Sequence, residues 1–175
     1  MHLKTTAIFL LLTAAVAGPG VSGELSFEPD TSCVVINDVF LMDVMIGEQD
    51  SIMGYDITIA FDGDILEPLG VYEGDLPVGS GHDTFFRWLN EDTADSTVTV
   101  NGSILGTTVS GPGVLFTISF RASQLGISPL EFGTCRMRNG LNEGLPLTFD
   151  EGWVRVMLPI STESSSWGAI KLMKR

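Results

Sequence analysis

The chain has 175 residues and is strongly acidic, with 22 Asp and Glu against nine Lys and Arg and a net charge of −13. This charge repels phosphate backbones, which argues against nucleic acid as a partner. The length fits one domain behind a short leader, and such a domain buries enough surface to fold without a metal ion.

The N-terminal segment has the three parts of a secretory signal peptide. Lys4 supplies the positive charge, an apolar run covers residues 7–17, and small residues continue to Gly23. The run is shorter than the roughly 20 apolar residues that a membrane-spanning helix needs. We therefore predict a signal peptide over residues 1–23, cleaved after Gly23 or alternatively after Ala17, and a secreted or cell-surface product. Removal of Lys4 leaves eight Lys and Arg against 22 acids, a net charge of −14.

Short runs of alternating apolar and polar residues follow, broken by Gly, Pro, Asn and Asp. This pattern is typical of β-strands with one buried face. The clearest strands are expected at residues 39–46, 55–61, 114–121 and 154–158, with weaker ones at 33–36, 66–72, 84–90, 97–104 and 130–136. About nine such strands predict an all-β fold, an antiparallel two-sheet sandwich over residues 24–160.

The two cysteines, Cys33 and Cys135, both lie after the signal peptide. An even number of cysteines in an exported chain favours a disulfide. A bridge between them would close a loop of roughly 100 residues, worth about 4–5 kcal/mol in the entropic model. The alternative is a pair of buried free thiols.

The residues after the signal do not indicate catalysis. His82 lies in a Ser80–Asp83 turn, whereas the members of a catalytic triad converge from separate elements. One histidine and two distant cysteines do not make a zinc site. A carboxylate pair for glycoside hydrolysis stays open, because sequence alone does not reveal which acids face one another.

Calcium is the one ion that the sequence favours, and no other cofactor is expected. Two acidic loops, at residues 62–64 and 90–95, offer the hard oxygen ligands that calcium prefers, although neither has EF-hand spacing. Asp92 and Asp95 in the second loop are the favoured ligands. The alternative is an ordinary solvated turn.

The strand at residues 55–61 carries a sharper signal. Its alternation directs Asp56 and Thr58 outward and four apolar residues inward: Tyr55, Ile57, Ile59 and Phe61. An Asp at a strand centre is disfavoured by β-propensity, so it indicates either solvent exposure or contact with a partner. Neighbouring strands are expected to add polar residues and a tryptophan to the same face: Trp88, Asn90, Thr97, Thr99 and Asn101. An exposed tryptophan there would suit a protein partner or a sugar ring.

Residues 161–175 differ in character from the domain. A serine-rich linker leads to an apolar and basic end that contains Trp167, Lys171, Lys174 and Arg175. These residues predict attachment, either as a short address read by export or surface machinery or through contact with an anionic membrane surface. The alternative is a frayed end.

Three segments together resemble cohesin domains. Residues 53–62, continuing to Ile65-Leu66-Glu67, resemble the third cohesin strand and the loop after it. Residues 113–120 resemble the family's Gly-Val-Leu strand, and residues 152–156 its closing Gly-x-Val-x-Val strand. The order and spacing match over most of residues 25–160.

The resemblance implies a nine-stranded jelly-roll sandwich, related in fold to some cellulose-binding modules, and a non-catalytic role. Cohesins bind dockerin modules and so assemble polysaccharide-degrading enzymes on a scaffold. An Asp in their third strand contacts dockerin, and Asp56 stands in that place. Gly54 stands where cohesins commonly have an Asn, so it belongs to the same expected face.

Two other functions stay open. A carbohydrate-binding module on the same architecture would bind polysaccharide and would need a row of coplanar exposed aromatic residues. The candidates for that row are Tyr72, Phe86, Trp88 and Trp153, whose alternation suggests that they are scattered. A structural surface protein held by its C-terminal tail would need no dedicated ligand.

Overall fold

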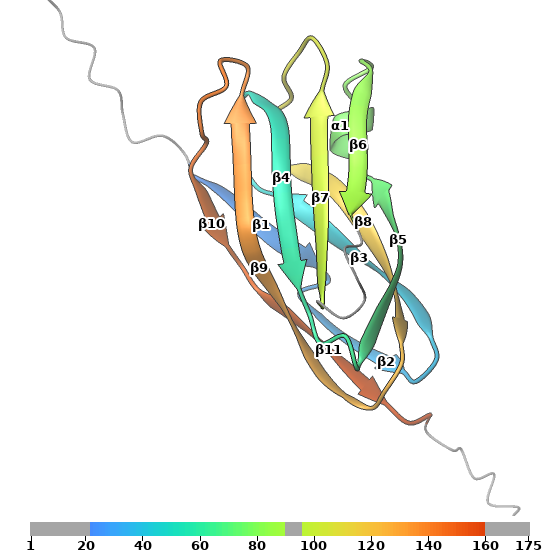
Figure 1. The fold of residues 1–175 in the computed structure, drawn as a ribbon. Coiled ribbons are helices and arrows are strands. Elements are labelled where there is room, and N and C mark those ends of the chain that lie inside the picture. The colour runs from blue at the N-terminus through green and yellow to red at the C-terminus, as the bar shows by residue number, and fades with distance from the viewer. Residues whose placement is uncertain (1–21, 90–95, 160–175) are drawn as a thin grey trace, which may run out of the picture.

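The structure, a computed structural model, describes residues 22–89 and 96–159, where eleven strands form two sheets (Figure 1). The five-stranded sheet has the order β10-β1-β3-β8-β5. Its strands are β1 (Gly23–Glu28), β3 (Val39–Ile46), β5 (Leu66–Glu73), β8 (Gly113–Ala122) and β10 (Leu147–Phe149).

The six-stranded sheet has the order β2-β11-β9-β4-β7-β6. Its strands are β2 (Thr31–Val35), β4 (Ile52–Ala60), β6 (Thr84–Leu89), β7 (Thr97–Ile104), β9 (Gly126–Asn139) and β11 (Gly152–Met157). The four strands β9, β4, β7 and β6 lie side by side on the near side of the molecule in Figure 1. The helix α1 (Asp75–Val78) is one turn, and the described ranges hold no helix with the length and apolar character to cross a membrane.

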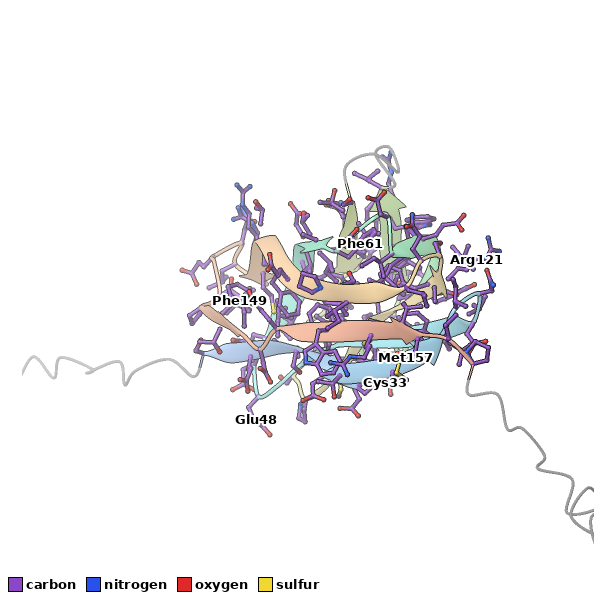
Figure 2. All side chains as sticks on the ribbon, turned by 90° about the horizontal axis from the view of Figure 1, so that it is seen from below. Cys33, Glu48, Phe61, Arg121, Phe149 and Met157 are labelled. Atoms are coloured by element: carbon purple, nitrogen blue, oxygen red, sulfur yellow. The ribbon has the colours of Figure 1, made fainter. Side chains whose placement is uncertain are left out.

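The two sheets pack through the apolar residues that alternate along their strands (Figure 2). Aromatic rings join the layers: Phe61 lies edge-on to Phe120 with ring centroids 5.2 Å apart, and Tyr55 stacks on Phe116 at 6.2 Å. The largest fully buried side chains are Phe116, Phe120, Leu25, Met42, Ile46, Ile52, Ile57, Ile59, Leu66, Ile104, Leu115 and Ile118. The core therefore draws on both sheets, and burying these side chains drives the packing of the layers.

The predicted all-β sandwich is confirmed, with differences in detail. β1 and the short β10 are strands that the alternation pattern did not single out, so eleven strands are present instead of nine. β11 ends at Met157, which leaves the predicted strand residue Leu158 exposed. β10 pairs with β1, and β2 with β11, in parallel, so the sheets are mixed rather than wholly antiparallel. Strands that pair in parallel are far apart in the chain, so the local alternation of residues does not reveal which strands pair in this way.

The predicted Cys33–Cys135 disulfide is wrong, because both thiols are free. Cys33 on β2 lies opposite Arg155 on the neighbouring strand β11, and Arg155 lies opposite Ile127 on β9. Ile127 is eight residues before Cys135 on the same strand. Two strand spacings and this length of β9 place the cysteines roughly 25 Å apart, whereas a disulfide needs Cα atoms within about 7 Å. Cys33 lies at the surface in Figure 2.

The two thiols are expected to differ in reactivity. Cys33 is exposed, whereas burial raises the pKa of the half-buried Cys135 thiol, which lowers its thiolate fraction. Iodoacetamide at pH 8 should therefore alkylate native Cys33 first, and denatured protein without reductant should take up two alkyl groups. Reductant should leave the melting temperature unchanged. Denatured protein that took up no alkyl group would show that a bridge exists.

Candidate binding face around Asp56

Strand β4 holds Asp56 outward because its neighbouring side chains fill the core. Tyr55, Ile57 and Ile59 are 5%, 0% and 0% exposed, so the two-residue alternation directs Asp56 and Thr58 to the opposite side. β4 is paired on both sides, with β7 and with β9. A strand held in this way cannot slip by one residue without burying Asp56 and exposing the core residues.

Asp56 lies in a row of polar residues that crosses four strands. In the β-ladders, Asp56 lies opposite Asn101 on β7 and opposite Arg136 on β9. Asn101 in turn lies opposite Arg87 on β6. Neighbouring strands are about 4.8 Å apart, so the row spans roughly 14 Å. The order Arg136, Asp56, Asn101, Arg87 places one carboxylate and one amide between two guanidinium groups.

Hydroxyl and small residues border this row. The Oγ1 atoms of Thr58 and Thr99 are hydrogen-bonded at 2.9 Å, and Thr99 pairs with Leu89 on β6. On the other side, the Ser103 hydroxyl donates to the Met53 carbonyl oxygen at 3.2 Å. The surface beside Asp56 is therefore a flat sheet face with short polar side chains.

A shallow hollow of about 250 Å³ adjoins Asp56, lined by Gly54, Tyr55, Asp56, Gly102, Arg136 and Arg138. Beneath it, the Tyr55 hydroxyl donates to the Leu115 carbonyl oxygen on β8 at 3.2 Å. Burial, with a further contribution from the charge of Glu73, raises the pKa of Tyr55 well above its ordinary value. Tyr55 therefore stays a neutral donor that ties β4 to the opposite sheet.

Arginines are the residues of this face that the sequence reasoning missed. Arg87, Arg136 and Arg138 all lie on it, whereas Arg121 pairs with Glu67 at 2.9 Å on the other sheet. Arg155 lies over the Trp153 ring on β11. The alternation Arg136-Met137-Arg138, with Met137 buried, was the sequence signal that could have found two of them.

The structure brings most of the predicted face residues together: Gly54, Asp56, Thr58, Thr97, Thr99 and Asn101. The predicted placement of Trp88 is wrong. Trp88 lies opposite the fully buried Val100 and packs against the core, because Phe85, Arg87 and Leu89 are the residues of β6 that face outward. Asn90 lies outside the described residues.

The aromatic candidates for sugar binding are scattered. Phe86 and Trp88 pack against the core, Tyr72 is exposed on the five-stranded sheet, and Trp153 belongs to the six-stranded sheet. Side chains on opposite layers do not make a coplanar row. A polysaccharide platform therefore gains no support from the part of the chain that the structure describes.

No cluster of three or more His, Cys, Asp or Glu side chains suited to a metal ion occurs within residues 22–89 and 96–159. In the 62–64 loop, Asp62 Oδ1 accepts a hydrogen bond from the Asp64 backbone at 3.0 Å, a turn-forming contact. The predicted calcium ligands Asp92 and Asp95 lie outside the described residues. The tail residues Trp167, Lys171, Lys174 and Arg175 also lie outside them.

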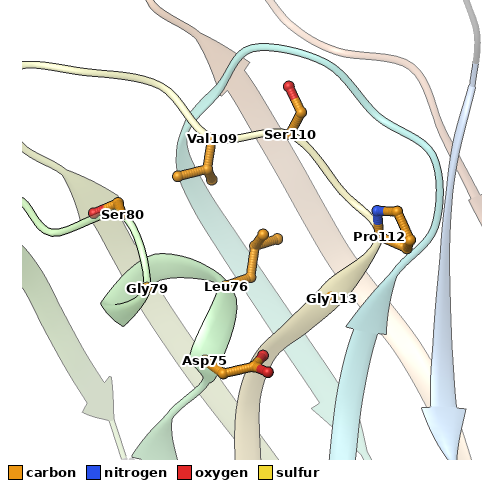
Figure 3. Close-up of a pocket in the computed structure, with 8 residues that line it drawn as sticks. All are labelled: Asp75, Leu76, Gly79, Ser80, Val109, Ser110, Pro112 and Gly113. Carbon is orange, nitrogen blue, oxygen red and sulfur yellow. The ribbon is translucent and has the colours of Figure 1, made fainter.

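A further hollow of about 400 Å³ lies beside α1, lined by Asp75, Leu76, Gly79, Ser80, Val109, Ser110, Pro112 and Gly113 (Figure 3). Asp75 Oδ1 accepts a hydrogen bond from the Val114 backbone at 3.2 Å, so this carboxylate helps to position β8. The lining contains two serine hydroxyls, and its one carboxylate accepts the hydrogen bond from the Val114 backbone. It contains no histidine, cysteine or lysine beside the serines that would act as a base.

Comparison with solved structures finds cohesins. A non-cellulosomal cohesin from the hyperthermophilic archaeon Archaeoglobus fulgidus has a TM-score of 0.67 at 15% identity, covering 89% of this chain and 100% of that chain. A type I cohesin–dockerin complex from Clostridium thermocellum matches with a TM-score of 0.65 at 18% identity, covering 78% and 100%. The sixth cohesin of scaffoldin B from Acetivibrio cellulolyticus, solved with a dockerin, has a TM-score of 0.65 at 17% identity. That match covers 78% of this chain and 100% of that chain.

No protein-family model and no curated protein matches the chain. The likeness therefore lies in the three-dimensional fold. The resemblance to cohesins that the sequence motifs carry is confirmed at that level: the chain has a cohesin-like β-sandwich fold.

Two glycines near Asp56 provide a matched test of how the face is built. A Cβ on the buried Gly102 would overlap the Tyr55 ring, whereas a Cβ on Gly54 would meet only ordinary contacts, the nearest at 3.4 Å. We expect Gly102→Ala to lower the free energy of unfolding by about 2–3 kcal/mol and Gly54→Ala to change it by less than about 1 kcal/mol. Urea unfolding measures both. Equal effects would contradict the packing of Tyr55 against β7.

Proposed function

We propose that this chain is a non-catalytic binding module of cohesin type, which takes a dockerin-like protein module on the outward face of β9, β4, β7 and β6. The observation that carries the proposal is the position of Asp56, at the centre of β4 and between two paired strands. The likeness to cohesins that were solved as dockerin complexes supports the choice of partner.

The physical character of the face suits protein recognition. The backbones of β9, β4 and β7 are fixed by ladders on both sides, so little conformational entropy is lost there when a partner binds. Asp56 forms no ion pair within the described ranges, which leaves its carboxylate free to accept hydrogen bonds from a partner. Thr58, Thr99 and Asn101 add donors and acceptors at fixed spacing, and such groups set specificity at an interface.

The setting of this module is part of the proposal. The signal peptide over residues 1–23 would export the chain, and the basic end at residues 161–175 would attach or sort it outside the cell. Extracellular assembly of polysaccharide-degrading enzymes is the context that a cohesin-type module would serve.

Asp56→Asn should weaken dockerin binding by at least about tenfold, because the substitution removes a charge at the centre of the interface and keeps its shape. Titration of the purified full-length chain against a panel of dockerin modules measures the dissociation constant. The matched control is Asp43→Asn, another half-buried acid in mid-strand but on the opposite sheet, where it accepts a hydrogen bond from Thr117.

The same titration separates the alternatives. Equal affinity for Asp56→Asn and unchanged protein would exclude this face as the dockerin site. Retention on insoluble polysaccharide without binding to any dockerin would contradict the cohesin-type function and favour a carbohydrate-binding module.

Export is testable by itself. Expression of the full-length chain in a secreting host should release a protein whose N-terminal residue is Glu24, because cleavage is expected after Gly23. N-terminal sequencing measures this. An N-terminus at Gly18 would identify the alternative site after Ala17, and an uncleaved Met1 would contradict a signal peptide.

A further inference from the structure

The arginines around Asp56 form a local cationic surface on an acidic protein. The chain has a net charge of −13, yet the outward face of β9, β4, β7 and β6 carries three arginines against two acids, Asp56 and Glu131. The outward acids of the five-stranded sheet, in contrast, include Glu24, Glu28, Asp43 and Glu67. The two broad faces of the sandwich therefore differ in the sign of their charge.

The three guanidinium groups are placed to act together. Arg136 lies next to Asp56, Arg87 ends the same row three strand spacings away, and Arg138 follows Arg136 two residues along β9, roughly 7 Å further. Arg136 and Arg138 are exposed, and neither forms an ion pair with another residue of the described ranges. Arg138 donates one hydrogen bond, from Nη1 to the Asn142 carbonyl oxygen at 3.0 Å. Its other guanidinium N–H groups can donate hydrogen bonds to a partner.

The residue type limits what this surface recognises. All five cationic side chains within the described ranges are arginines, and the guanidinium group binds carboxylates through two parallel hydrogen bonds. Screening confines the field of a surface charge to about 8–10 Å at physiological salt, so this group acts on a partner in contact despite the net negative charge of the protein.

We propose that Arg87, Arg136 and Arg138 bind carboxylate side chains of the partner module, so that an acidic segment of the partner lies across β9, β4, β7 and β6. This inference rests on the proposed function, which it deepens by stating the charge of the partner. Glu131, the other acid of this face, lies opposite Ala60, four residues along β4 from Asp56. Asp56 is therefore the carboxylate nearest to the arginines, and its position fixes how the partner is oriented.

A second copy of this chain fits the surface less well. On its own acidic face, Glu67 is paired with Arg121 and Asp43 accepts a hydrogen bond from Thr117, so two of the four carboxylates are already engaged. A stack of identical chains would have to break these contacts. Self-association of the full-length chain that Arg136→Gln abolished would overturn the assignment to a different module.

The test compares two arginines of one sheet. Arg136→Gln should weaken binding of the tightest dockerin in the panel by about tenfold and should reduce the salt dependence of the affinity. Arg155→Gln is the matched control, because it makes the same charge change on β11, away from Asp56, and should alter the affinity less than about twofold. Arg136→Lys should bind more tightly than Arg136→Gln but less tightly than the unchanged chain. A lysine keeps the positive charge but lacks the two parallel N–H donors of the guanidinium group.

A second measurement does not depend on dockerins. A hexaglutamate peptide, with hexaglutamine as the control, is titrated into the isotope-labelled full-length chain while the arginine Nε–H resonances are followed by NMR. Arg87, Arg136 and Arg138 should shift with hexaglutamate alone, and Arg121 and Arg155 should not. Equal shifts at all five arginines, or none, would overturn the proposal.

The outcomes separate the two claims. If Asp56→Asn weakens dockerin binding and Arg136→Gln does not, the arginine assignment fails and the proposed function stands. If no dockerin binds but hexaglutamate shifts the three arginines, the proposed function fails and the carboxylate-binding surface stands.

Discussion

The burial of every second side chain of β4 is the constraint on which the candidate site depends. Tyr55, Ile57 and Ile59 fill the interior, and the Tyr55 hydroxyl reaches the carbonyl oxygen of Leu115 on the opposite sheet. Since a shift by one residue would exchange the two faces of the strand, the core fixes the outward position of Asp56. The ladders to β7 and β9 then set which polar residues stand beside it.

Much of the fold follows from alternation alone, and so does part of the site. The pattern around residues 55–61 predicts both the buried residues and the outward Asp56, because one face of the strand is wholly apolar. Pairing between distant strands is different, since it depends on how the two sheets close. The strand β11 lies between Cys33 on β2 and Cys135 on β9, which is why an even cysteine count gave a wrong disulfide.

The edge strand β6 illustrates where pattern reasoning is ambiguous. Phe85 and Phe86 are adjacent, so either alternation phase supplies an aromatic residue, and an outward Trp88 is as consistent with the sequence as an inward one. The structure selects the phase in which Trp88 packs on the core and Arg87 faces solvent. That choice places Arg87 on the candidate face together with the exposed Phe85. The chemistry expected of the partner therefore includes charge recognition as well as apolar contact.

The proposed function places the partner on the face of β9, β4, β7 and β6. Chemical-shift mapping of the labelled full-length chain with a bound dockerin module tests it most directly. This placement predicts that the strongest perturbations fall on Asp56, Thr99 and Arg136 and their strand neighbours. Perturbations centred instead on Leu41 and Tyr72, which are exposed on the five-stranded sheet, would contradict it.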